Sequence, residues 1–446
     1  MRFKIDIPQN ANVIIHTLKN NGYTAYIVGG CVRDSIMGRK PHDWDICTSA
    51  TPDQLLEIFM NYKVIETGLK HGTITIVIDG EQYECTTYRI DGEYSDNRRP
   101  DNVTFTNDLI EDLKRRDFTI NAMAYNDEEG LIDPFNGVLD ISRKLICCVG
   151  TPEERFNEDA LRIMRAIRFA AQLDFHIDQY THIAMIELSD NLKNISAERI
   201  NSELCKTITS KNPAYWISNS RYILGKVIPE IEDMIGFKQR NPYHQHNVFN
   251  HTIQAIWNCT STDLIARLAV LFHDIGKPHC YQDGEDGIRY FKGHNRVSAD
   301  MTDKIMKRLK FDNETRNNVV ELVYYHDATF EADKKYVKHW LNKIGVDQFR
   351  KLLDIRRADI KGQKFHYDKE RIEKVDNIER LLEEVLQEKQ CFALKDLAIN
   401  GKDLMEIGFK AGKELGEALN RLLEGVINEE FENEKDYLLK VAKARL

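Results

Sequence analysis

The spacing of apolar residues divides the chain into a mixed first part and a helical remainder. Residues 24–30 (TAYIVGG) predict a strand closed by a glycine turn, and the following CVRDSIMG predicts a short helix. HDWDIC alternates polar and apolar residues, which predicts a second strand. GTITIVID and EQYECTTYRI predict a hairpin with Asp79 and Gly80 at its turn. Residues 1–150 are therefore expected to form a mixed α/β domain.

From Thr151 onward the strand signals disappear. EDALRIMRAIRFAAQL and AERINSELCKTI carry apolar residues at helical spacing, so the remainder is expected to be mainly helical. NPY and the glycine-rich QDGEDG interrupt this region, and residues 361–368 have the character of a linker. We expect four regions with the boundaries 1–150, 151–240, 241–365 and 366–446.

Length and composition agree with a chain of several domains. The 446 residues exceed one compact core, and no apolar run approaches the ~20 residues that span a bilayer, so no membrane segment is expected. MRFKIDIPQN lacks the pattern of a signal peptide, and the nine cysteines form no CxxC pair, which predicts a cytoplasmic protein. The net charge is −9, but local clusters such as Lys114-Arg115-Arg116 still suit phosphate binding.

Two carboxylates follow the glycine turn along the chain. Residues two apart in a strand face the same side, so Asp43 and Asp45 are expected to project together and to offer the oxygen ligands that Mg²⁺ prefers. The preceding VGGCVRD supplies glycines, a helix start and Arg33, which suit a metal-bound triphosphate. The combination predicts nucleotidyl transfer, with Mg²⁺ activating a hydroxyl for attack on an α-phosphate.

Charged residues recur every three positions in RFNEDALRIMRAIRFA. Asp159, Arg162, Arg165 and Arg168 are expected on one slowly drifting face of a helix that begins near Phe156. A carboxylate acceptor beside a guanidinium donor imitates the edge of a nucleobase, so Asp159 and Arg162 are candidates for reading a base. The alternative is an ion-paired, solvated helix face.

These segments together resemble a known enzyme family. GGCVRD followed by HDWDICT is similar to the signature of class II tRNA nucleotidyltransferases and bacterial poly(A) polymerases, within the polymerase-β-like superfamily. The resemblance continues in order through residues 88–105, 115–125, 133–137, 155–170 and 195–204. It implies an α+β protein, in which a polymerase-β-like nucleotidyltransferase head is followed by all-helical neck, HD and tail domains.

The resemblance also implies roles for single residues. Asp43 and Asp45 would be catalytic and hold Mg²⁺, and Glu84 and Asp117 are both candidates for a third carboxylate. GEYSDNRRP (92–100) is similar to the loop that accompanies the switch from C to A addition. The EDxxR element would select CTP or ATP, so that protein replaces a nucleic-acid template. The residues expected to bind nucleotide are Gly30, Arg33, Arg116, Asp159, Arg162, Arg165 and Arg168.

Five downstream elements, HNVFNHT, LFHDIGK, GHN, YYHD and RRADIKG, are similar to an HD domain, a helical metal-binding fold of phosphohydrolases. Imidazole with carboxylate suits Mn, Fe, Ni, Co or Zn better than Mg alone, and a bridging hydroxide would hydrolyse a phosphoester. His244 and His246 are expected to be satisfied or exposed. The resemblance implies the ligands His251, His273, Asp274 and Asp359 for a first metal, with His294 and His326 for a second.

The prediction is a CCA-adding tRNA nucleotidyltransferase that uses CTP and ATP without a template. Its tail, residues 366–446, would contact tRNA phosphates through Lys402, Lys410 and Lys413. Three alternatives stay open: an enzyme that adds only A, a poly(A) polymerase, and an HD-type phosphohydrolase with an inactive head. The sequence leaves the oligomeric state and the HD metal open.

Overall fold

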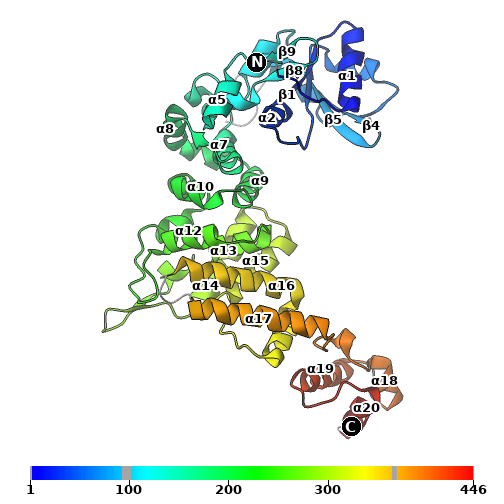
Figure 1. Cartoon of the computed structure of the whole chain (residues 1–446), viewed down its shortest axis with the longest axis vertical. Coiled ribbons are helices and arrows are strands. Elements are labelled where there is room, and N and C mark those ends of the chain that lie inside the picture. Colours follow the sequence, from blue (N-terminus) through cyan, green and yellow to red (C-terminus); the bar gives the residue numbers. More distant parts are fainter. Residues whose placement is uncertain (1–2, 93–101, 364–368, 445–446) are drawn as a thin grey trace. The chain divides into compact units, whose positions relative to one another are not determined.

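The computed structural model describes residues 3–92, 102–363 and 369–444. The chain divides into two compact units, which we call the N-terminal unit (residues 1–229) and the C-terminal unit (residues 230–446). The first combines a sheet with helices and the second is almost entirely helical, which confirms the predicted α+β class (Figure 1). Of the predicted loop at 92–100, all but Gly92 lies outside the described residues.

A seven-stranded sheet forms the centre of the N-terminal unit, in the order β3-β4-β5-β2-β1-β8-β9. Only β2 and β5 run parallel; the other neighbouring strands are antiparallel. Ile46 pairs with Ile27 on one side and with Cys85 on the other, so β2 lies in the middle of the sheet. The strands are β1 (Ala25–Val28), β2 (Ile46–Thr48), β3 (Lys63–Ile65), β4 (Thr73–Ile78), β5 (Glu81–Thr87), β8 (Ala124–Asn126) and β9 (Gly130–Ile132).

Both faces of the sheet are covered, as the alternation of side chains along β1 shows. Ile27 packs into a cluster with residues of α1 (Gln9–Asn20), α2 (Gly30–Ile36) and α3 (Pro52–Ile58). Its neighbours Tyr26 and Val28 point to the opposite face and pack with Tyr88 and Leu113. The strand carrying the glycine turn is therefore fixed from both sides.

The predicted hairpin is confirmed, whereas the predicted second strand is shorter than expected. Asp79 and Gly80 both have positive φ angles between β4 and β5, as a two-residue hairpin turn requires. Strand β2 begins only at Ile46, so Asp43 and Asp45 precede it rather than lie within it. The backbone amide of Val28 still donates to the carbonyl of Asp45 at 2.9 Å, which holds Asp45 against the end of β1.

The expected helix from Phe156 is two helices, α6 (Pro152–Glu158) and α7 (Leu161–Leu173). Asp159 has extended backbone angles, and its carboxylate accepts the Leu161 amide at 3.1 Å, so it ends one helix and opens the next. The prediction that Asp159 shares a helical face with the three arginines is therefore wrong. The other helices of this unit are α4 (Leu109–Lys114), α5 (Gly137–Arg143), α8 (Gln179–Glu187), α9 (Ala197–Ile208), α10 (Pro213–Asn219) and α11 (Arg221–Val227).

Short strand pairs accompany the main sheet. Strand β6 (Arg89–Asp91), which overlaps the end of the predicted strand EQYECTTYRI, pairs with β7 (Val103–Phe105), and β10 (Leu145–Ile146) pairs with β11 (His176–Ile177). In the C-terminal unit, β12 (Gln282–Asp283) and β13 (Arg289–Tyr290) form the arms of the glycine-rich loop. The expectation that strands end at residue 150 was wrong for β11, β12 and β13, because two-residue strands carry too short a pattern to recognise.

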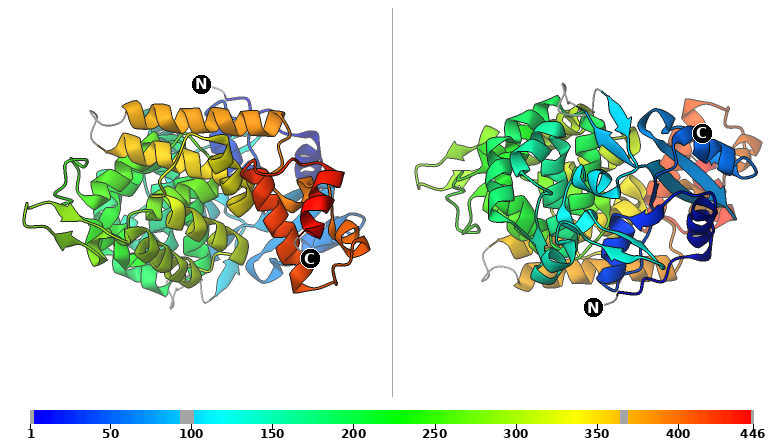
Figure 2. Two further views of the ribbon diagram at one scale, coloured as in Figure 1. Left: turned by 90° about the horizontal axis from the view of Figure 1, so that it is seen from below. Right: turned by 90° about the horizontal axis from the view of Figure 1, so that it is seen from above.

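The helices of the C-terminal unit pack around α16 (Lys334–Gly362), which contacts α12, α13, α15 and α17. Helices α16 and α17 lie side by side in every view (Figure 2). Helix α16 continues to Gly362, so the predicted linker at 361–368 begins later than expected. The other helices are α12 (Val248–Asn258), α13 (Leu264–Phe272), α14 (His294–Arg308), α15 (Asn313–Tyr325), α17 (Lys369–Gln387), α18 (Gly401–Glu406), α19 (Lys413–Ile427) and α20 (Lys435–Lys443).

None of the helices in the described residues is both long and apolar enough to cross a membrane.

Phe118 is fully buried and meets the ring of Phe169 edge-on at 5.9 Å, which joins the sheet domain to α7. Phe118→Ala should lower the free energy of unfolding of the N-terminal unit by ~3–5 kcal/mol, because it leaves a cavity. Chemical denaturation followed by circular dichroism measures this. Ile110→Ala, at a side chain that is 39% exposed, should change it by less than ~0.5 kcal/mol; equal effects of the two variants would contradict the packing argument.

Candidate functional site

Asp45 directly precedes the central strand β2 and lies beside Glu84 of β5. The parallel register pairs Ile46 with Cys85, so the residues one step earlier, Asp45 and Glu84, are neighbours. Burial and the negative charges of Glu84 and Asp43 together raise the pKa of Asp45 to about 6, although Arg116 opposes them. Three carboxylates thus share one edge with a single guanidinium, which leaves a negative site suited to a hard cation.

The alternative third carboxylate, Asp117, has a different environment. It is buried, its Oδ2 accepts from Arg165 Nε at 2.8 Å, and its Oδ1 accepts from the Asn121 amide at 3.1 Å. Although burial opposes it, Arg165 lowers the pKa of Asp117 to about 2. Asp117 therefore anchors Arg165, and Glu84 is the acidic neighbour of Asp45.

The carboxylates of the head are near one another but do not form a compact group of ligand atoms. Asp43 has an 83% exposed side chain, and its Oδ1 lies 3.0 Å from Nδ1 of His42. Among the described residues, sets of three or more ligand atoms that all lie within 4.8 Å of one another occur in the C-terminal unit and not around Asp45.

The glycine turn brings Arg116 close to the backbone. Gly29 has a φ of 82°, and a Cβ atom there would lie 3.2 Å from Nη1 of Arg116. Gly30, the residue expected to matter, has ordinary backbone angles and its Cβ would meet only Nη2 of Arg33 at 3.7 Å. The position that requires glycine is thus Gly29, which the pattern of two adjacent glycines did not distinguish.

Three of the predicted nucleotide-binding arginines surround one aromatic ring that the sequence analysis missed. The guanidinium carbons of Arg33, Arg165 and Arg168 lie 5.2, 5.3 and 4.1 Å from the centroid of Phe169. Arg168 also pairs with buried Glu203 at 2.8 Å. Burial lowers the pKa of Arg168, and the like charges of Arg165 and Arg33 act in the same direction. This group of cations is suited to a polyanion.

The predicted pair of Asp159 and Arg162 is arranged differently. Asp159 accepts two hydrogen bonds from Arg199, at 2.6 and 3.2 Å. Arg162 is buried and donates to the backbone carbonyls of Arg155 and Arg115, each at 2.9 Å. Arg162 thus holds the Arg115-Arg116 segment against α6, and Arg199, on helix α9, is the partner of Asp159 that sequence spacing did not indicate.

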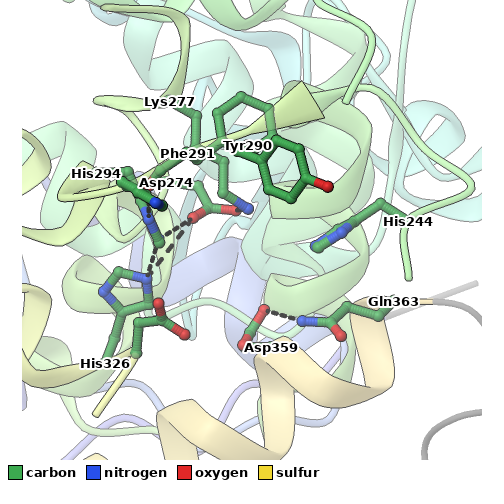
Figure 3. A pocket seen from close by; sticks show the side chains of 11 residues that line it. His244, Asp274, Lys277, Tyr290, Phe291, His294, His326, Asp359 and Gln363 are labelled. Carbon is green, nitrogen blue, oxygen red and sulfur yellow. Dashed lines mark hydrogen bonds and ion pairs between the residues drawn. The ribbon is translucent and has the colours of Figure 1, made fainter. Parts of the chain in front are cut away.

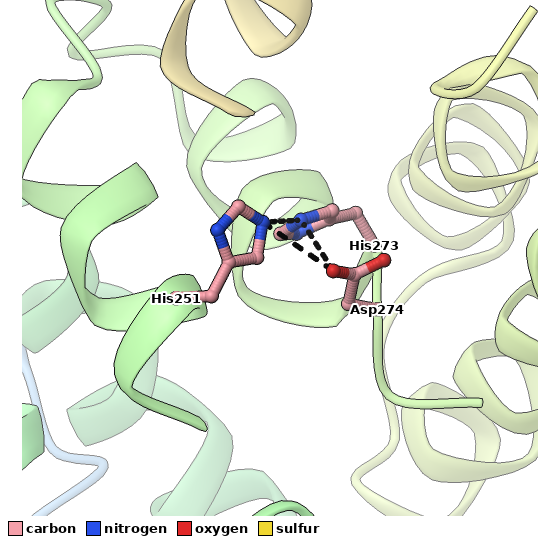
Figure 4. Close-up of side chains that lie close together, drawn as sticks. All are labelled: His251, His273 and Asp274. Atoms are coloured by element: carbon pink, nitrogen blue, oxygen red, sulfur yellow. Dashed lines mark hydrogen bonds and ion pairs between the residues drawn. The ribbon is translucent and has the colours of Figure 1, made fainter. Parts of the chain in front are cut away.

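In the C-terminal unit, all six predicted HD residues converge in the interior. They come from five separate parts of the chain, at the ends or on the inner faces of the helices α12 to α16. Asp274 is 1% exposed and lies between two pairs of imidazoles. Its Oδ2 is 3.4 Å from Nε2 of His251 and 3.3 Å from Nε2 of His273 (Figure 4). Its Oδ1 is 3.5 Å from Nε2 of His294 and 3.7 Å from Nε2 of His326.

The four imidazoles are held with one nitrogen directed at the carboxylates. In each, Nδ1 contacts a backbone carbonyl, which only accepts, so Nδ1 carries a proton and Nε2 is the nitrogen that faces the carboxylates. The Nδ1 acceptors are Gly362 for His251 at 3.0 Å, Val270 for His273 at 2.7 Å, Phe291 for His294 at 2.9 Å and Val323 for His326 at 2.6 Å.

The Nε2 atoms face each other in two pairs. Nε2 of His251 lies 3.2 Å from Nε2 of His273, and Nε2 of His294 lies 3.1 Å from Nε2 of His326. Burial lowers the pKa of His294 to about 4, so its Nε2 is free of a proton at neutral pH. Asp359 Oδ1 lies 3.0 Å from Nε2 of His251. The donor set fits one or two divalent cations with Asp274 between them.

A cavity of about 300 Å³ adjoins this cluster. Lys277, Tyr290 and His244 line it together with Asp274 and Asp359 (Figure 3). Nζ of Lys277 lies 2.6 Å from Asp274 Oδ2, where it neutralises part of the buried negative charge.

His244 is the residue of this cavity that the sequence analysis undervalued. Its Nδ1 is 2.8 Å from Oδ1 of Asn241, but its buried Nε2 has no hydrogen-bond partner. Burial lowers the pKa of His244 to about 2, so the ring is neutral. The expectation of a satisfied or exposed histidine is therefore wrong for His244. His246 fits it better, because it is half-buried and its Nε2 lies 3.2 Å from the Gln245 amide.

Comparisons with known proteins cover nearly the whole chain. Residues 25–147 match the family model described as "Poly A polymerase head domain". Residues 174–222 match "Probable RNA and SrmB- binding site of polymerase A", and residues 291–442 match "tRNA nucleotidyltransferase domain 2 putative".

Similar proteins carry one common name. The chain is 34% identical over 436 residues to a CCA-adding enzyme of Lactobacillus helveticus, covering 98% of this chain and 96% of that protein. A crystal structure of the Bacillus stearothermophilus CCA-adding enzyme in complex with CTP is 30% identical with a TM-score of 0.73, covering 98% and 97%. A Thermotoga maritima CCA-adding enzyme complexed with tRNA_CCA shares the fold at 19% identity, with a TM-score of 0.62 and a coverage of 99% and 97%.

The similarity thus extends over both units, and the head of the chain carries the glycine turn, carboxylates and arginines in the order that first indicated nucleotidyl transfer. The chain belongs to the family of CCA-adding tRNA nucleotidyltransferases.

Proposed function

We propose that this chain adds C, C and A to the 3′ end of tRNA from CTP and ATP, without a nucleic-acid template. The observation that carries the proposal is 34% identity to a CCA-adding enzyme over 98% of the chain. An enzyme that adds only A and a poly(A) polymerase share the head chemistry and remain the alternatives, which product length and nucleotide use distinguish.

In this proposal Asp43 and Asp45 hold Mg²⁺, and Glu84 adds a third negative charge. Bound Mg²⁺ polarises the attacking 3′-hydroxyl and neutralises charge on the triphosphate. The fit rests on Asp45, whose pKa is raised first by burial and then by the negative charge of Glu84. Because its folded pKa exceeds its unfolded value, ionised Asp45 destabilises the fold at neutral pH, and a bound cation would remove that cost.

The residues around the turn at Gly29 would hold the triphosphate. Arg116 approaches Gly29 closely and also acts electrostatically on Asp45, so it bridges the turn and the carboxylates. Arg33, Arg165 and Arg168 around Phe169 supply further positive charge. We assign Gly30 to the same turn as the first residue of α2.

For base selection we propose that Asp159 presents its carboxylate to the incoming base while Arg199 orients it. Arg162 is buried against backbone carbonyls, so its role is to hold the Asp159 junction in place. The pocket would then read a base through Asp159 and Arg199, and Arg162 would position them.

A second function is favoured by one specific observation, the four imidazole Nε2 atoms that surround Asp274. We propose a metal-dependent phosphohydrolase site at which His251, His273, Asp274 and Asp359 hold one divalent cation and His294 and His326 with Asp274 hold another. Mn, Fe, Ni, Co and Zn suit this mixed donor set. A bound metal supplies hydroxide at neutral pH, and Lys277 is placed to attract the phosphate of an ester.

The proposed functions correspond to the regions expected from sequence. Residues 1–150 would form the nucleotidyltransferase head, 151–240 the neck that binds base and RNA, and 241–365 the metal-binding HD region. Residues 366–446 would form the tail, in which Lys402, Lys410 and Lys413 are exposed and available to tRNA phosphates.

The first prediction tests CCA addition through Asp45. With tRNA lacking its last three nucleotides, the chain should add C and C with CTP alone and C, C and A with CTP and ATP. Asp45→Asn should reduce incorporation at least about 10³-fold, because one metal-holding charge is lost. Sequencing of the 3′ end measures both.

Asp53→Asn, the same change at an exposed position of α3, is the matched control and should leave addition intact. The thermal midpoint of Asp45→Asn should equal or exceed that of the wild type, since the variant removes carboxylate repulsion. Long A tails would favour the polymerase alternative, no use of CTP would favour the A-adding enzyme, and full activity of Asp45→Asn would refute the metal assignment.

The second prediction concerns base selection. Asp159→Ala and Arg199→Gln should each lower the preference for CTP and ATP over UTP and GTP by about tenfold, as expected for one lost hydrogen bond in a base pocket. Comparing kcat/KM for the four nucleotides measures the preference. Glu198→Gln, next to Arg199 and exposed, should retain it, and unchanged selectivity in both test variants would contradict the proposed pocket.

The third prediction concerns the metal in the C-terminal unit. The full chain should bind Mn²⁺ more tightly as the pH rises from about 5.5 to 8, because protons compete for Nε2 of His273, whose pKa Asp274 raises although burial opposes it. His273→Ala should weaken binding at least about tenfold, while His279→Ala, at a 41% exposed side chain, should not. Isothermal titration calorimetry measures both.

Hydrolysis of phosphate esters should be lost in His273→Ala and retained in Asp45→Asn. If His273→Ala keeps both Mn²⁺ binding and hydrolysis, the proposed metal site is wrong. If addition to tRNA fails in the wild type while hydrolysis depends on His273, the phosphohydrolase with an inactive head is the better description.

A further inference from the structure

We propose that His244 is a substrate-binding residue of the C-terminal metal site, and that its Nε2 accepts a hydrogen bond from a substrate hydroxyl beside the scissile phosphate. The site would then prefer phosphate esters of ribonucleotides over their deoxy counterparts. The inference rests on the proposed phosphohydrolase function and names its substrate class.

Hydrogen bonds around Asn241 determine which nitrogen of His244 carries the proton. Oδ1 of Asn241 accepts the backbone amides of Tyr243 and His244, each at 3.1 Å, so this atom is the amide oxygen. The same oxygen lies 2.8 Å from Nδ1 of His244, which must therefore donate its proton. The remaining nitrogen, Nε2, is an acceptor in the neutral ring.

That acceptor is buried and lacks a partner within the protein. Nε2 of His244 is among the buried atoms without a hydrogen bond, although a buried polar atom without one is costly. The ring meets that of His251 edge-on at 4.9 Å, which fixes its orientation. His244 faces the cavity across from His294 and His326 (Figure 3). A cost of this kind is expected where a ligand completes the site.

His244 differs from the residues assigned to the metals. It belongs to neither group of ligand atoms that lie within 4.8 Å of one another, the one formed by His251, His273 and Asp274 or the one formed by Asp274, His294 and His326. It is therefore placed to contact what the metals bind, rather than the metals themselves.

The other residues of the cavity indicate what that ligand carries. Lys277 and Lys292 supply positive charge for a phosphate, and Tyr290 and Phe291 supply aromatic surface for a ring system. The unpartnered Nε2 of His244 calls for a donor on the ligand, and a hydroxyl neighbouring the phosphate is the donor that a ribonucleotide brings. These features together favour a ribonucleoside phosphate.

The test compares adenosine 3′-monophosphate with 2′-deoxyadenosine 3′-monophosphate, which differ by one hydroxyl, on the Mn²⁺-loaded full chain. The wild type should prefer the ribonucleotide by about 10- to 100-fold in kcat/KM. His244→Phe keeps the ring and should lower kcat/KM for the ribonucleotide to the level of the deoxynucleotide, with little change for the deoxynucleotide. His244→Gln, which retains an acceptor oxygen, should recover part of the preference.

His246→Phe is the matched control, because this histidine is close in sequence and its Nε2 already has a neighbour. Mn²⁺ content, measured by atomic absorption, should be unchanged in His244→Phe. Equal losses for both substrates, or loss of Mn²⁺, would overturn the proposal by making His244 a structural or metal-holding residue.

Binding of the two nucleotides, measured by equilibrium dialysis, separates this proposal from the one on which it rests. If the wild type hydrolyses neither nucleotide but still binds the ribonucleotide more tightly, and His244→Phe abolishes that difference, the phosphohydrolase function fails and the role of His244 stands. If hydrolysis occurs without any preference for the ribonucleotide, the role of His244 fails and the phosphohydrolase function stands.

Discussion

Asp117 is buried in the N-terminal unit, and its ion pair with Arg165 compensates for a charge that the interior would otherwise not tolerate. The pair connects the segment that carries Arg116 to helix α7. Arg162 reinforces the connection by donating to the carbonyl of Arg115. Arg116 itself pairs with buried Asp112 at 3.2 Å, so its position beside Gly29 and Asp45 depends on this near neighbour and on the contacts that hold its segment to α7.

The C-terminal unit also buries carboxylates, but their negative charge is balanced differently. Asp274 and Asp359 are buried, and Lys277 and Arg356 are the nearest permanent cations, at 2.6 and 3.6 Å. The remaining neighbours of Asp274 are imidazoles whose Nδ1 protons are already donated to backbone carbonyls. In the head the protein supplies the full countercharge of Asp117. Here permanent cations supply only part, and the divalent cation that we propose for this site would complete the balance.

The sequence predicted local features well and pairings across the chain less well. The turn at Asp79 and Gly80 was predictable because positive φ angles restrict the residue types. The break at Asp159 was not, since helical spacing continues through it and only the capping hydrogen bond to Leu161 reveals it. Arg199 was missed because its partner Asp159 lies forty residues away. The choice between Glu84 and Asp117 needed the register of β2 and β5.

The predicted ligands of the C-terminal unit converged because each lies at a helix end or on an inward face, where short motifs fix position. Short motifs did not identify His244. A histidine near a helix start is ordinary in sequence, and its significance comes from two facts of structure. Asn241 Oδ1 accepts a hydrogen bond from Nδ1, and no group among the described residues donates one to Nε2. The head carboxylates offer only oxygen, whereas the C-terminal site offers nitrogen and oxygen. The two proposed metal sites therefore differ in their donor atoms, and the nitrogen donors of the C-terminal site favour transition metals over Mg²⁺.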